Sequence, residues 1–117
     1  MISYGRIFRI NRLILGVSLE YIVSKVDKNK YKLATTGVLS RMERNKDGMN
    51  EELYIHLLSI LGLKYNADQQ EEINQMVDIE FEKIIEYRLN GKGIYDECIK
   101  NIMDKEDIIR TSFSYPK

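Results

Sequence analysis

The chain of 117 residues is long enough for one domain, or for one small domain with an extension. Its one cysteine excludes a disulfide framework and fits a reducing compartment, so we expect a cytoplasmic protein. No apolar run approaches the roughly 20 residues of a membrane span, and the N-terminus lacks a secretory pattern. One proline and seven glycines favour long helices, which predicts an all-α fold.

The net charge of zero hides an uneven distribution along the chain. Residues 1–64 carry 11 Lys+Arg and 6 Asp+Glu, which gives +5, whereas residues 65–117 carry 7 and 12, which gives −5. A basic half suits a polyanion, because neutralising phosphates releases counterions. An acidic half would repel DNA and is expected to face protein or solvent. The alternative is a chance asymmetry between two helical segments.

Residues 4–15 are predicted to form the first helix, which ends at Gly16 because glycine tolerates the left-handed conformation. Phe8 and Leu15 lie on the face that we expect inside. A second apolar row on the same helix consists of Ile7, Ile10 and Ile14. This row needs a cover, which is either the C-terminal half of the chain or another subunit.

Ser18 is expected to cap a second helix, because a hydroxyl accepts a hydrogen bond from an N–H of the first turn. The buried stripe of this helix consists of Leu19, Ile22, Val23 and Val26. Residues 27–32 follow as a polar link, which is either a solvated loop or a segment that places lysines on a DNA backbone. The lysines in question are Lys28, Lys30 and Lys32.

Residues 33–45, LATTGVLSRMERN, are predicted to form a short helix that Thr35 or Thr36 caps. The inner face repeats at helical spacing and consists of Ala34, Leu39 and Met42. The opposite face has small groups in front and guanidinium groups behind, namely Thr36, Gly37, Ser40, Arg41 and Arg44. A major groove accepts such a helix, because small residues permit close approach and arginines reach bases or phosphates. The alternative is a solvated amphipathic helix.

Asn50 is expected to cap a fourth helix that Gly62 closes. The apolar stripe of this helix consists of Leu53, Leu57, Leu58 and Leu61. His56 has no Cys, His or carboxylate at ligand spacing, so we expect a surface or core-edge residue rather than a metal ligand or a base.

Residues 68–90 and 94–103 are predicted to form an αα-hairpin with a short glycine link. Val77 belongs to the apolar face of this hairpin, and Cys98 is expected to serve packing. The carboxylate pairs that include Glu82 are expected to lie on a solvated polar face. The chain has no phosphate-cradling glycine loop, no metal-ligand spacing and no nucleophile beside a base, so we expect neither an enzyme nor a cofactor.

Over about residues 3–65 the chain resembles the phage-repressor-type (XRE-like) helix-turn-helix family. The matching pieces are Gly5, Arg12, Gly16-Val17-Ser18-Leu19, Leu39-Ser40-Arg41-Met42-Glu43-Arg44-Asn45-Lys46 and Leu61-Gly62. The resemblance implies a four-helix repressor-type bundle that binds double-stranded DNA sequence-specifically. Members of the family usually act as homodimers on near-palindromic sites, so a homodimer is expected here.

The resemblance also implies roles for single residues. Thr36 would lie near bases and Thr35 near a phosphate, Arg41 would reach a base edge, and Arg44 and Lys46 would hold the DNA backbone. The full set of implied DNA-binding residues is Thr35, Thr36, Gly37, Ser40, Arg41, Arg44 and Lys46.

A structural ion pair between Arg12 and Glu43 is implied as well, tying the first helix to the end of the third. The chain departs from the family in the longer link before the third helix, where Leu33 replaces the usual glycine of a tight turn. Gly37 stands where many members have a base-reading side chain, and Asn11 replaces an apolar residue of the first helix.

We therefore expect two parts, a DNA-binding domain over residues 1–66 and an acidic helical hairpin over residues 67–117. The hairpin is expected either to form the contact between the two subunits of a dimer or to be the start of a helical-repeat region. In the second case it more loosely resembles the Rgg/PlcR-like regulators, and a peptide effector is expected only if the chain is part of a longer regulator. The alternative function is a protein-interaction module, an adaptor or antitoxin-like partner, that uses the acidic hairpin.

Overall fold

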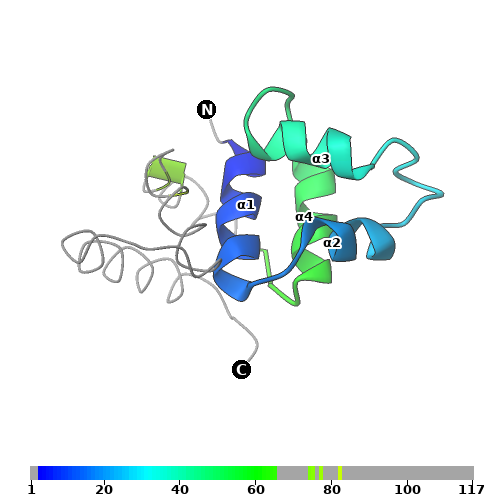
Figure 1. Cartoon of the computed structure of the whole chain (residues 1–117), viewed down its shortest axis with the longest axis horizontal. Coiled ribbons are helices and arrows are strands. Elements are labelled where there is room, and N and C mark those ends of the chain that lie inside the picture. The colour runs from blue at the N-terminus through cyan, green and yellow to red at the C-terminus, as the bar shows by residue number, and fades with distance from the viewer. Residues whose placement is uncertain (1–2, 66–73, 76, 78–81, 83–117) are drawn as a thin grey trace.

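The computed structural model describes residues 3–65, 74–75, 77 and 82, and this part of the chain is all-α (Figure 1). Its helices are α1 (Tyr4–Leu15), α2 (Leu19–Lys25), α3 (Thr36–Glu43) and α4 (Glu51–Ile60). The all-α prediction is confirmed, and the four helices lie where the sequence places them. The hairpin predicted over residues 68–103 and Cys98 lie outside the described residues, apart from the four positions named above.

Side-chain caps and left-handed glycines set the ends of these helices. The Ser18 hydroxyl accepts a hydrogen bond from the Tyr21 N–H at 3.1 Å, and the Asn50 side chain accepts one from the Leu53 N–H at 2.8 Å. Gly16 has a φ of 67° at the end of α1, where its N–H bonds to carbonyls of the last turn. Each cap satisfies backbone groups that a helix end leaves without partners.

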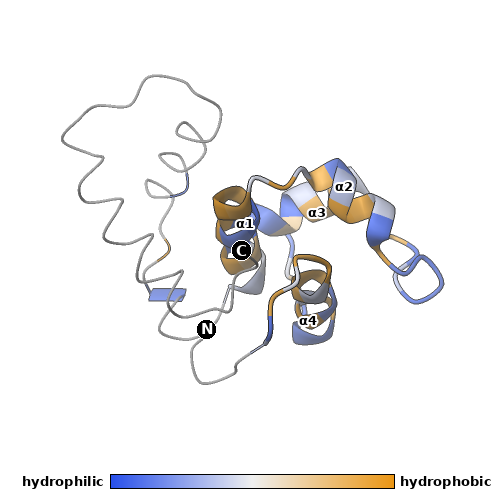
Figure 2. Cartoon of the chain, turned by 90° about the horizontal axis from the view of Figure 1, so that it is seen from below, coloured by the Kyte–Doolittle hydropathy of each residue, from blue (hydrophilic) through white to orange (hydrophobic). Residues whose placement is uncertain are grey.

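The core lies between α1, α2, α3 and α4, and its largest fully buried side chains come from all four helices. They are Tyr54, Phe8, Ile7, Ile10, Ile22, Leu39, Leu57 and Leu58. Figure 2 shows apolar residues on α1, α2 and α4, whereas the loop between α2 and α3 is hydrophilic and projects from the bundle. The apolar stripes predicted for α2, α3 and α4 therefore contribute to one core.

The second apolar row of α1 is buried within the chain. Ile7 and Ile10 are fully buried and Ile14 is 5 % exposed. Val77, from the segment after α4, is 4 % exposed and belongs to the same core. The chain itself therefore covers this row of isoleucines. The row is not a surface for another subunit, which was the other possibility. Leu15, expected inside, is only partly buried.

Helix α1 also approaches α3 closely, and Gly5 makes this possible. A methyl group added at Gly5 would overlap the backbone carbonyl of Met42. Asn11, which stands where the resemblance implies an apolar residue, is fully buried and donates from Nδ2 to the Ile7 carbonyl at 2.8 Å. Burying this amide is tolerated because it is hydrogen-bonded. Within the described residues no helix is long and apolar enough to cross a membrane.

Candidate nucleic-acid interface

Helix α3 has one face in the core and the other in solvent. Thr35 is its N-cap and accepts a hydrogen bond from the Val38 N–H at 3.2 Å, which settles the choice between the two candidate threonine caps. Ala34 before the helix and Leu39 within it are buried, and Met42 packs against the core. The inner face is therefore the one that the sequence predicts, and the helix is held by it.

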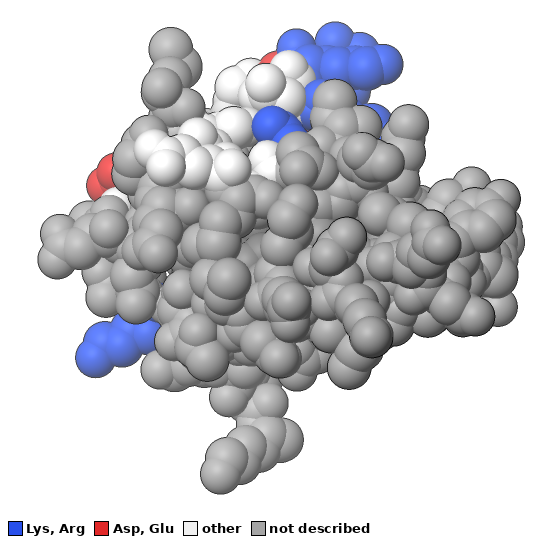
Figure 3. All heavy atoms as spheres, turned by 90° about the vertical axis from the view of Figure 1, so that its left-hand side faces the viewer, with Lys and Arg blue, Asp and Glu red and all other residues white. Residues whose placement is uncertain are grey.

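The residues implied to bind DNA lie on α3, at its cap or directly after it. Thr35, Gly37, Arg41, Arg44 and Lys46 are exposed. The remaining two, Thr36 and Ser40, are half-buried. Figure 3 shows lysine and arginine side chains gathered at the upper right of the molecule, at the height at which α3 and the loop after it lie in Figure 1, and others at the lower left.

Gly37 leaves the exposed side of α3 flat near its N-terminus. No heavy atom lies within 4 Å of the position that a Cβ would take there. Its φ is not among the positive values, which occur at Gly16, Gly62 and Asn45 among the described residues. Gly37 is thus not required by the backbone, and it leaves open space on this side of the helix.

An ion pair orients Arg41 at the other end of α3. Its Nε donates to Oδ2 of Asp47 at 2.7 Å, and the two side chains remain 58 % and 47 % exposed. The hydrogen bond lowers the pKa of the Asp47 carboxyl and raises the pKa of Arg41. The turn between them is closed by the Lys46 N–H, which donates to the Arg41 carbonyl at 2.9 Å. Asp47 thereby holds the Nε side of the guanidinium.

Arg12 and Glu43, the two residues implied to pair, do pair. Arg12 Nε and Nη2 donate to the two carboxylate oxygens of Glu43 at 2.8 and 2.7 Å, and Nη1 donates to the Val17 carbonyl at 2.9 Å. The Glu43 side chain is 3 % exposed. A two-point contact of this kind fixes orientation as well as distance. It fastens the last turn of α3 to α1 and to the turn after α1.

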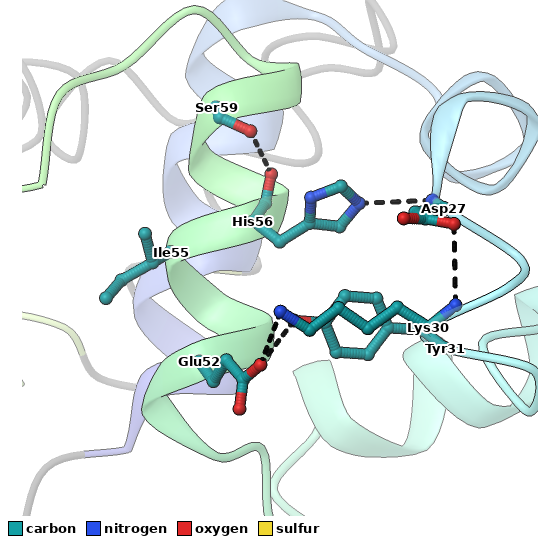
Figure 4. Close-up of a pocket in the computed structure, with 7 residues that line it drawn as sticks. All are labelled: Asp27, Lys30, Tyr31, Glu52, Ile55, His56 and Ser59. Carbon is teal, nitrogen blue, oxygen red and sulfur yellow. Dashed lines mark hydrogen bonds and ion pairs between the residues drawn. The ribbon is translucent and has the colours of Figure 1, made fainter.

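The loop between α2 and α3 is attached to α4 by four contacts (Figure 4). The Asp27 N–H donates to Nε2 of His56 at 3.2 Å, and the His56 ring stacks on Tyr31 with centroids 5.1 Å apart. Lys30 pairs with Glu52 at 2.7 Å, which raises the pKa of Lys30 and lowers that of Glu52, and the Tyr31 hydroxyl donates to Glu52 at 3.5 Å. The residues line a pocket of about 410 Å³.

Two of the three lysines of the loop have partners within the chain, although all three side chains are exposed. Lys30 is engaged by Glu52, and Lys28 donates from Nζ to the Ala34 carbonyl at 2.9 Å, next to the cap of α3. His56 lies at the edge of the core, as expected. Within the part of the chain that the structure describes, no group of three or more His, Cys, Asp or Glu side chains could hold a metal ion.

No protein-family model, curated protein or solved structure matches the chain.

A buried charge cluster on α1 was missed by the sequence interpretation. Glu82 accepts from Arg6 Nε and from Arg9 Nη1, both at 3.3 Å, and its side chain is 4 % exposed. Arg6 also donates to the Val77 carbonyl at 2.8 Å. Burial raises the pKa of Glu82, and the two arginines oppose this shift. The prediction of a solvated Glu82 is wrong, because Arg6 and Arg9 of α1 donate hydrogen bonds to this carboxylate, which is almost fully buried.

Proposed function

We propose that the chain is a DNA-binding transcriptional regulator whose recognition helix is α3. The observation that carries the proposal is the contrast between the two sides of this helix. The inner side is fixed by the core and by the Arg12–Glu43 pair, whereas the outer side presents Gly37 and Arg41 to solvent. Side chains that bind a ligand specifically must be held in a fixed position. A recognition helix meets this condition when its inner face is packed against the core of its domain.

The charges at the end of α3 support the same proposal. In the run SRMERNK the one acidic residue, Glu43, is buried and neutralised by Arg12. The three basic residues of the run, Arg41, Arg44 and Lys46, remain exposed. Asp47 is the neighbouring acid, and it is bonded to Arg41. The exposed charge is thus mainly positive, which favours a polyanion through release of its counterions.

The direct experiment is selection of bound DNA from a random pool with the full chain, followed by affinity measurements over a range of salt concentrations. We expect a specific dissociation constant of order 10⁻⁸–10⁻¹¹ M and a steep fall in affinity with salt. Arg41→Ala is expected to weaken discrimination at one base pair roughly 5- to 150-fold, because arginine reads guanine through two hydrogen bonds.

A matched pair of variants separates a specific surface from general basicity. Arg44→Ala removes an implied phosphate contact and is expected to reduce the salt slope by about 1. Lys64→Ala removes the same charge from the exposed chain after the far end of α4, and it is expected to leave the slope unchanged. Absence of any selected sequence, or binding that does not respond to salt, refutes the proposal.

We further propose that the regulator acts as a homodimer, so that the selected site is a near-palindrome with half-sites about 34 Å apart. Sedimentation of the full chain with and without the selected duplex tests this. The alternative, an adaptor or antitoxin-like interaction module, rests on the acidic second half alone, because the isoleucine row of α1 is buried. A pull-down that captures one protein partner and no DNA favours that alternative.

A further inference from the structure

Leu33 is the most exposed large hydrophobic residue in the described part of the chain. Its relative exposure is 79 %, against 49 % for Tyr21 and 38 % for Ile55. A single exposed apolar side chain is ordinary on a protein surface. The location of Leu33 is not ordinary, because it lies two residues before the Thr35 cap of α3.

The exposure of Leu33 is set by backbone that is held on both sides. Before it, Tyr31 stacks on His56, and the Ala34 N–H donates to the Tyr31 carbonyl at 3.2 Å. After it, Ala34 is 4 % exposed, its carbonyl accepts from Lys28 Nζ at 2.9 Å, and the Thr35 N–H donates to the Leu33 carbonyl at 2.8 Å. Leu33 is thus presented outward by a fixed turn, since both neighbouring segments are anchored.

The chemistry of leucine restricts what it can read at the start of a recognition helix. The N-terminal residues of such a helix contact base edges in the major groove. The apolar group that base pairs present in this groove is the C5-methyl group of thymine, and hydrogen-bonding positions give leucine nothing to bind. Thr36 and Gly37, which follow the cap, are small and leave room for DNA to approach the turn.

We propose that Leu33 contacts the 5-methyl group of a thymine and so adds apolar readout to the base contacts of α3. The proposal rests on the function proposed above for α3. It names a specificity residue outside the helix, in the turn where the family resemblance implies a glycine. It also predicts that the DNA site contains a thymine next to the bases that the first turn of α3 contacts.

Deoxyuridine scanning tests this contact, because deoxyuridine lacks only the methyl group of thymine and keeps its hydrogen bonds. Each thymine of a DNA site selected by the full chain is replaced in turn. We expect one position in each half-site to lose about fourfold in affinity, which is the effect of one buried methyl group. At that position Leu33→Ala is expected to bind the thymine and deoxyuridine sites equally, whereas Leu33→Met keeps a preference for thymine.

Ile55→Ala is the matched control, since Ile55 is another exposed aliphatic residue, on α4, and its loss should leave the deoxyuridine response intact. The leucine contact is refuted if the chain selects a DNA site but no deoxyuridine substitution lowers its affinity, or if Leu33→Ala shows the same loss of affinity as the parent chain. The proposal that α3 is the recognition helix is then unaffected. The same holds if Leu33→Ala changes only the sedimentation of the protein. If no DNA is selected at all, the function proposed for α3 fails together with this contact.

Discussion

Arg12 donates to both carboxylate oxygens of Glu43, at 2.8 and 2.7 Å. This contact joins the last turn of α1 to the end of α3. The pair is nearly buried, with side-chain exposures of 13 % and 3 %. The third donor of Arg12 is used by the Val17 carbonyl. A change in this pair therefore reaches both α3 and the turn between α1 and α2.

We predict that Glu43→Gln destabilises the protein by about 3–5 kcal/mol, because removal of one partner leaves a buried guanidinium without its counter-charge. Urea unfolding of the full chain, followed by circular dichroism, measures this. The double change Arg12→Met with Glu43→Leu is expected to recover part of the loss, since it removes both charges. A loss from Glu43→Gln no larger than that from the exposed Asp47→Asn change would contradict the prediction.

Substitution by alanine is predicted to destabilise the protein at Gly5 and to stabilise it at Gly37. Gly5→Ala places a methyl group on the Met42 carbonyl and forces α1 away from α3, at a cost of about 1–3 kcal/mol. Gly37→Ala adds a methyl group in open space on a helix, and is expected to stabilise the protein by up to about 1 kcal/mol. Paired urea unfolding curves test both, and equal effects of the two changes would exclude a specific close approach at Gly5.

Asp47 is predicted to sharpen the specificity of Arg41. Asp47 binds Nε of Arg41, so the proposed contact with a base edge would be made by the two terminal nitrogens. Asp47→Asn removes a carboxylate whose lowered pKa keeps it charged, so binding to unrelated DNA is expected to tighten. The ratio of specific to non-specific affinity is expected to fall, because Arg41 loses its orientation. An unchanged ratio with tighter binding throughout would show that Asp47 acts only through its charge.

Much of the fold could be predicted because it is decided locally. Ser18, Thr35 and Asn50 each accept a hydrogen bond from an N–H three residues later. Four consecutive residues are therefore enough to predict where such a helix begins. Gly16 and Gly62 mark two ends through positive φ values. Periodicity then identifies the buried stripes, which is why the faces of α2, α3 and α4 are as predicted.

The parts that could not be predicted depend on contacts between distant residues. Glu82 lies 76 and 73 positions from Arg6 and Arg9, and no local pattern distinguishes it from a solvated acid. The exposed face of α3 was predicted from spacing, but Arg12 was matched to Glu43 only through the family resemblance. The hydrogen bond from Arg41 to Asp47 depends on how the turn after α3 closes, so residue spacing alone does not indicate it.

The pKa of the Tyr4 hydroxyl is predicted to depend on one carboxylate of α4, that of Glu51. Its hydroxyl donates to Oε2 of Glu51 at 2.8 Å, and its ring lies 4.8 Å from that of Tyr54. Burial, and then Glu51, raise the pKa of Tyr4 and likewise that of Tyr65. Because the pKa is raised in the folded state, the contribution of Tyr4 to stability is fully present below the unfolded pKa of about 10 and is lost as the pH rises further.

Glu51→Gln is therefore expected to let the late-titrating phenols ionise at lower pH than in the parent chain, because the neutral amide no longer opposes a phenolate. Phenolate absorbance during an alkaline titration measures this, with circular dichroism recorded in parallel to follow the helices. Glu52→Gln removes the same charge from the same first turn, but its carboxylate pairs with Lys30 and Tyr31. An equal shift in both variants would assign the effect to the charge of the helix end rather than to the contact between Tyr4 and Glu51.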